Sequence, residues 1–174
     1  ASINWFYEGP EISYKRFGTG NRPPGFRNRN TERIVVDPGV EPEMIRSFII
    51  YGDTMRKTHV ISVGSPKGVH YTFDMNDAAI IKAWKGKFAD TDDMWHERGE
   101  PQLLRPRNFA IEPKDGLPIA LLNSADASWE SNKENYKFKR YKLSTDGYPI
   151  FEYTFKNLEF SDDVRPSEDG QGLV

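Results

Sequence analysis

Short stretches of β-branched and aromatic residues, bounded by turn-forming residues, recur along most of this chain. Val69, Tyr71 and Phe73 occupy every second position, so their side chains share one face of an extended strand. The stretch 79–84 follows the turn sequence 74–77 and is predicted to return as the partner strand. Because one hairpin follows another, the pattern predicts antiparallel pairing.

The second half of the chain continues this pattern. Tyr136 and Phe138 alternate with lysines, and Tyr141 continues the series after a change of phase that predicts a β-bulge. The turn sequence 145–147 separates this strand from the alternating aromatic residues of 151–155. Two shorter apolar runs, 109–111 and 119–122, flank a predicted turn at 113–116, and 125–134 has room for one or two helical turns.

These patterns predict an all-β protein with mostly antiparallel strands. Short strands with a turn every 8 to 12 residues are typical of a β-sandwich, which is the preferred architecture. A partial barrel is one alternative, and a propeller-like unit, suggested by the hairpin at 71–84, is another. The propeller is disfavoured because no period of roughly 40 residues recurs.

The first 33 residues differ from the rest because turn formers and arginines replace the periodic apolar pattern. We expect residues 1–33 to form an extended Arg/Gly/Pro-rich arm and residues 34–174 to form a single β-rich domain. One interpretation is that the arm docks on a partner chain, with the phenylalanines as buried anchors. Its candidate contacts are Arg16, Phe17, Arg22, Phe26, Arg27 and Arg29. The alternative is an arm draped over the domain, with its arginines solvated or paired to acidic groups.

Composition excludes several classes of protein. The 24 Lys and Arg against 26 Asp and Glu give no overall attraction to nucleic acid or anionic membranes. No apolar run approaches the roughly 18 residues of a membrane helix. The chain has no cysteine, which excludes disulfides, thiolate zinc sites and covalent attachment of a c-type haem. No nucleophile elbow occurs either, so the chain by itself is not expected to be an enzyme.

The densest polar cluster lies between residues 90 and 100. Carboxylate oxygens at nearby positions of a flexible loop suit Ca²⁺, although the spacing is not that of an EF-hand. The candidate ligands are Asp90, Asp92, Asp93 and Glu97. Trp95 would then offer a stacking surface for a sugar. The alternative is an acidic loop in which Trp95 is buried and Arg98 pairs with Asp92 or Asp93.

The three histidines are His59, His70 and His96. A metal site or a non-covalent haem would need two of these side chains, or one with a methionine, to converge, and their spacing neither supports nor forbids this. His70 alternates with Val69 and Tyr71, so it points to the opposite face and is expected to be exposed or to line a groove.

Several stretches follow one another along the chain, namely 62–74, 84–90, 94–99, 104–106, 146–153 and 170–173. In this order they resemble a β-rich domain of large secreted bacterial proteins that carry c-type cytochrome modules, often joined to quinoprotein-like or carbohydrate-related domains. The resemblance implies a periplasmic or extracellular setting and larger cytochrome-containing proteins or other subunits as partners, with haem on the partner chain. It supplies no catalytic role. It singles out Trp84, Trp95, His96 and Arg98 as the lining of a shared ligand pocket or as a shared structural corner.

The leading hypothesis is therefore a non-catalytic module or subunit of a cytochrome-linked electron-transfer complex. The second is a carbohydrate-binding domain in which Trp84, Trp95 or Trp129 stacks on a glycan. A third is a haem- or metal-dependent enzyme domain that uses His70 and His96.

Overall fold

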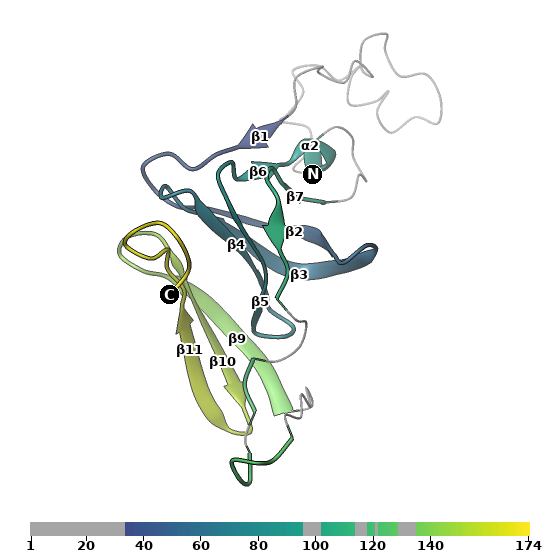
Figure 1. Ribbon diagram of the computed structural model, residues 1–174, viewed down its shortest axis with the longest axis vertical. Coiled ribbons are helices and arrows are strands. Elements are labelled where there is room, and N and C mark those ends of the chain that lie inside the picture. Colours follow the sequence, from purple (N-terminus) through teal and green to yellow (C-terminus); the bar gives the residue numbers. More distant parts are fainter. Residues whose placement is uncertain (1–33, 96–101, 114–117, 121, 129–134) are drawn as a thin grey trace, which may run out of the picture. The chain divides into compact units, whose positions relative to one another are not determined.

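The computed structural model describes residues 34–95, 102–113, 118–120, 122–128 and 135–174. Residues 34–174 form one compact unit built from three sheets of mostly antiparallel strands (Figure 1). The all-β prediction is confirmed, and the architecture is consistent with a β-sandwich. Among the described strands, none of the three sheets closes into a barrel.

A five-stranded central sheet with the order β2-β3-β4-β5-β8 contains the predicted hairpins. Its strands are β2 (Glu43–Tyr51), β3 (Met55–Gly64), β4 (Val69–Asp74), β5 (Ala79–Lys85) and β8 (Ala110–Ile111). Tyr71 pairs with Ala83 in the β4–β5 hairpin, as the alternation predicted. The turn that joins these two strands is closed by a hydrogen bond from the Asp77 N–H to the Asp74 carbonyl.

The C-terminal sheet has the order β11-β10-β9. Its strands are β9 (Tyr136–Leu143), β10 (Pro149–Phe155) and β11 (Leu158–Asp163). Glu152 pairs with Arg140 but Tyr153 pairs with Phe138, so Lys139 has no opposite residue and the predicted bulge is confirmed. The turn between β9 and β10 needs a left-handed residue, and Gly147 supplies it with a φ of 83°.

A small third sheet and one short helix complete the described elements. The sheet has the order β1-β6-β7, with β1 (Val35–Val36), β6 (Ala89–Asp90) and β7 (Arg105–Pro106). Helix α2 (Asp92–Trp95) follows β6 directly. In the described part of the chain, no helix has the length and hydropathy needed to cross a bilayer.

Two hydrophobic clusters occupy opposite faces of the central sheet. On one face, Ile61, Tyr71 and Phe73 pack against the inner residues of the C-terminal sheet, where the Phe73 and Phe151 rings stack with centroids 3.8 Å apart. On the other face lies a cluster of buried side chains from the central sheet, β6 and the segments beside it, namely Ile49, Val60, Ala79, Ile81, Trp84, Phe88, Ala89 and Leu104. Every residue of β4 is consequently buried, because both of its faces are covered.

Two segments in the second half of the chain are irregular where the structure describes them. Ile119 and Ala120 lie outside any strand, although Ile119 packs against the first hydrophobic cluster as an irregular segment. Residues 125–127 form a turn and a bend, and 129–134 lie outside the described residues, so the one or two helical turns expected within 125–134 stay a prediction. Ile119 and Ala120 are partly buried without regular backbone pairing, and Leu122 is exposed.

Candidate functional site

The predicted calcium cluster begins where β6 leads into α2. Asp90 is buried, and its Oδ1 accepts a hydrogen bond of 3.0 Å from the Asp92 N–H. The Asp92 Oδ1 accepts one of 3.2 Å from the Ile34 N–H. The Asp90 carboxylate therefore binds a backbone amide at the start of the helix, and the Asp92 carboxylate joins the helix to the residue before β1.

Asp93 is held by an ion pair with Arg105. Sequence reasoning offered Arg98 as the partner of Asp92 or Asp93, but Arg98 lies outside the described residues. Arg105 reaches this position because β6 and β7 pair antiparallel, with Asp90 opposite Arg105. That register could not be read from the spacing in the chain.

Within the described residues, no three His, Asp or Glu side chains converge as a metal site requires. His96, Glu97 and Arg98 lie outside the described part, and so does the side chain of Trp95. The proposed arm contacts are also outside it: Arg16, Phe17, Arg22, Phe26, Arg27 and Arg29. The calcium, arm and His96 hypotheses therefore stay predictions.

Trp84 forms a structural corner and not an open platform. Its side chain is buried, and its indole N–H donates to the carbonyls of Lys87, at 3.1 Å, and Phe88, at 2.9 Å. The Trp84 and Phe88 rings are nearly parallel, with centroids 5.8 Å apart. A glycan could not stack on this indole, so the hypothesis that Trp84 is a sugar-binding platform is corrected.

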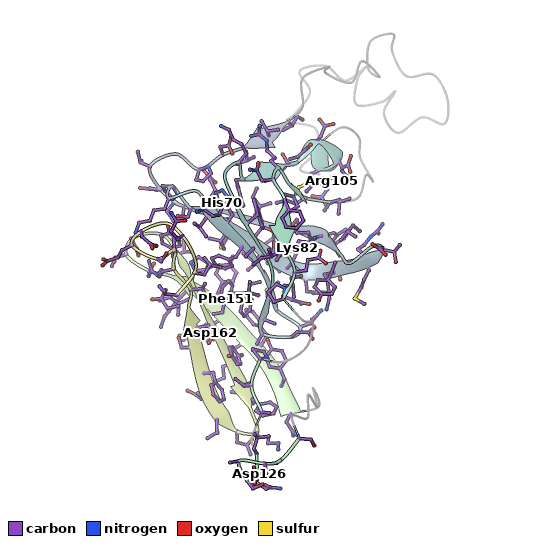
Figure 2. The ribbon with its side chains drawn as sticks, viewed as in Figure 1. His70, Lys82, Arg105, Asp126, Phe151 and Asp162 are labelled. Atoms are coloured by element: carbon purple, nitrogen blue, oxygen red, sulfur yellow. The ribbon has the colours of Figure 1, made fainter. Side chains whose placement is uncertain are left out.

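His70 is also buried, against the expectation that it would be exposed or line a groove (Figure 2). Its Nδ1 accepts from the Ser65 N–H at 3.1 Å, and its Nε2–H donates to the Gly86 carbonyl at 2.8 Å. These two bonds assign the neutral Nε2–H tautomer, and burial lowers the pKa of the ring. Alternation placed His70 on the correct face of β4, but that face is covered by the second hydrophobic cluster.

The three rings of His70, Trp84 and Phe88 form what we call the aromatic corner. The His70 centroid lies 5.6 Å from that of Trp84 and 5.1 Å from that of Phe88. Gly64 makes room for this corner, since a Cβ there would lie 2.7 Å from the Phe88 ring. The stretch 62–74, through His70, meets the stretch 84–90, through Trp84 and Phe88, at this corner.

Sequence reasoning missed a buried triad formed by Lys57, Asp74 and Asp77. The Lys57 Nζ lies 3.1 Å from the Asp74 Oδ2 and 3.0 Å from the Asp77 Oδ2. The Asp74 Oδ1 accepts from the Asn76 N–H at 2.9 Å. Burial raises the pKa of Asp74 despite this bond and the nearby ammonium. The sequence predicted a turn at 74–77, but no pattern near these residues indicated that Lys57 lies against them.

A second acidic group lies on the inner side of the C-terminal sheet. The Tyr153 hydroxyl donates to the Asp162 Oδ2 at 3.0 Å, and the Tyr136 hydroxyl donates to the Met75 carbonyl at 2.5 Å. Burial raises the pKa of Asp162. These bonds join the strands of the C-terminal sheet to each other and to the turn after β4.

The edge strand β8 presents large apolar side chains to solvent. Phe109 is 88% exposed and Ile111 is 60% exposed. Ala110, between them, packs against the second hydrophobic cluster, so alternation directs Ile111 away from that cluster. We call Phe109 and Ile111 the apolar edge.

No family model, no curated protein and no solved structure matches this chain.

Proposed function

We propose that this chain is a non-catalytic module of a secreted or periplasmic electron-transfer assembly and that the haem resides on a partner chain. The resemblance of its ordered stretches to domains of cytochrome-linked proteins suggests the setting. The observation that carries the interaction role is the apolar edge. Two large exposed apolar side chains at the end strand of the central sheet, Phe109 just before β8 and Ile111 within it, favour a contact with another protein.

The position of the apolar edge suits docking. β8 is the last strand of the central sheet, and sheet edges accept an added strand or loop from a partner. Side chains such as Phe109 contribute most to binding when they are solvent-exposed in the free protein and fully desolvated in the complex. The two-residue length of β8 also limits indiscriminate pairing, since short edge strands are poor templates for aggregation.

The chemistry of the described polar groups supports a module over an autonomous enzyme. The His70 ring is engaged at both nitrogens by backbone groups, and Asp93 is paired with Arg105. The indole of Trp84 is likewise bonded to backbone carbonyls. Each of these side chains is engaged by groups of the fold itself, which supports the interpretation of Trp84 as part of a structural corner.

The experiment is isolation of the full chain from its native source without denaturant, followed by an optical spectrum and haem staining of co-purifying chains. The test variant carries Phe109→Ser and Ile111→Ser, and the control is Val40→Ser, because Val40 is 96% exposed and belongs to the segment between β1 and β2. We expect a Soret band with the wild type and the control. If each anchor contributes about 2 kcal/mol, the double variant loses roughly a thousandfold in affinity.

A colourless lone chain from the native preparation would overturn the electron-transfer setting. A haem protein that co-purifies equally well with the double variant would instead show that the contact lies elsewhere, and the apolar edge would lose its proposed role.

A further inference from the structure

We propose that Lys57 and Asp74 become joined by an intramolecular amide bond after folding, with Asp77 as the proton acceptor. This inference is independent of the proposed function. It rests on the geometry of the buried triad, in which one amine lies within hydrogen-bond distance of two carboxylates. The electrophilic carbon, Cγ of Asp74, is one bond beyond the oxygen that Lys57 already contacts.

The two residues that react, Lys57 and Asp74, both lie on strands of the central sheet. Asp74 pairs with Val60 across β3 and β4, and Lys57 lies three residues earlier on β3. The β2–β3 register is irregular between Ser47 and Ile49, so Ser47 pairs with Val60 and Ile49 pairs with Lys57. The irregularity therefore places Lys57 and Val60 on the same face of the sheet, beside the Asp74 carboxyl. Such fixed positioning supplies much of what an intramolecular reaction needs.

The surroundings of the triad are largely dry. The Lys57 side chain is 12% exposed, and the side chains of Asp74 and Asp77 are almost fully buried. Ile49 and Val60 are buried neighbours, and the Tyr51 ring lies 5.8 Å from the Lys57 Nζ. Burial favours the uncharged forms of amine and carboxyl group, which are the forms that react with each other. It also raises the pKa of Asp74, which favours its acid form.

The reaction balances without a co-reactant. Asp77 takes one proton from the Lys57 ammonium, and the freed amine attacks Cγ of Asp74 in its acid form. The C–N bond forms, the bond from Cγ to the hydroxyl breaks, and a second nitrogen proton leaves with that hydroxyl as water. Asp77 releases its proton to solvent. The product is a neutral amide, so the step removes the buried positive charge of the Lys57 ammonium, while Asp77 is a carboxylate before and after it.

The first measurement is the intact mass of the denatured full chain. We expect a deficit of one water, about 18 Da, relative to the sequence. Trypsin should then yield the segments 57–67 and 68–82 as one branched peptide, with no cleavage after Lys57. Succinimide formation at an Asp-Gly pair such as Asp146-Gly147 gives the same deficit. It is distinguished because hydroxylamine opens a succinimide and leaves the amide intact.

The variants separate chemistry from stability. Lys57→Arg and Asp77→Asn should each have the full sequence mass, because one lacks the nucleophile and the other lacks the proton acceptor. Lys82→Arg is the matched control, since Lys82 is also 12% exposed and pairs with a single carboxylate, Glu112. It should retain the deficit. The wild-type mass decides the matter even if a variant fails to fold.

A full-mass wild type would overturn the proposal and leave the triad as a buried ion cluster. A deficit that maps to any other pair of residues would overturn it as well. A deficit mapped to Lys57 and Asp74 that persists in Asp77→Asn would refute the role given to Asp77.

Discussion

Replacing Gly64 by alanine tests whether the aromatic corner is as tightly packed as its geometry indicates. A Cβ at this position would lie 2.7 Å from two carbons of the Phe88 ring, a separation that requires something to move. Phe88 has little freedom to do so. It is fully buried, its ring contacts those of both His70 and Trp84, and its N–H donates to the Asp37 Oδ1 at 2.7 Å.

Two effects of opposite sign determine the result. Alanine restricts the unfolded chain and so stabilises a protein by about 0.4–1 kcal/mol where the backbone tolerates it. Overpacking of a core costs about 1–3 kcal/mol. Because Phe88 cannot move without disturbing these contacts, the cost of overpacking should exceed the gain from restricting the unfolded chain. The free energy of unfolding should fall by about 1–2 kcal/mol.

The assay is urea unfolding of the full chain, with Gly39→Ala as the control, because no atom lies within 4 Å of a Cβ built at Gly39. With an m-value of about 2 kcal/mol/M, Gly64→Ala should lower the unfolding midpoint by roughly 0.5–1 M relative to the control. Adding Phe88→Leu should recover part of the loss if the two positions are in contact. A Gly64→Ala variant as stable as the control would refute the packing argument.

Two further predictions concern pH and the buried titratable groups. The folded pKa of His70 lies below its ordinary value of 6.5, so its contribution to stability is full above pH 6.5 and is lost as the pH falls through the folded pKa. The free energy of unfolding should therefore decrease from pH 7.5 to pH 5 by an amount that His70→Gln reduces, and unfolding curves at the two pH values measure it. The contribution of Asp162 to stability changes with pH in the opposite direction. Its folded pKa lies above its ordinary value of 3.8, so its charged form is disfavoured at neutral pH. Asp162→Asn keeps an oxygen that can accept from the Tyr153 hydroxyl, so this variant should be more stable than the wild type at pH 7, by a difference that shrinks toward pH 4. Unfolding curves at both pH values measure this difference. Equal stability of variant and wild type at pH 7 would contradict the burial argument.

Much of the fold could be predicted because its signals are local. The alternation of Val69, Tyr71 and Phe73 identified a strand, and the change of phase before Tyr141 identified the bulge now located at Lys139. The turn at Gly147 requires a left-handed backbone conformation, which residues other than glycine adopt less easily. Each of these features depends on residues close together in the chain.

The candidate sites could not be predicted as well, because they depend on which surfaces the fold covers. An imidazole and an indole are side chains that often bind ligands, so His70 was a reasonable candidate for a groove and Trp84 for a sugar-binding platform. The second hydrophobic cluster buries both of them, and it includes Leu104 and Phe88 from outside the β3–β4–β5 hairpins. Alternation assigns a side chain to a face, but only packing decides whether solvent reaches that face.

The sequence by itself determined the all-β class, the hairpin order and the positions of the main turns, because period-two alternation and turn chemistry act over a few residues. The tertiary structure decided the layers on both faces of the central sheet, the burial of His70 and the meeting of Lys57 with Asp74 and Asp77. These features depend on strand register and on contacts between distant segments. A shift of one residue in register would move each of these side chains to the other face of its sheet.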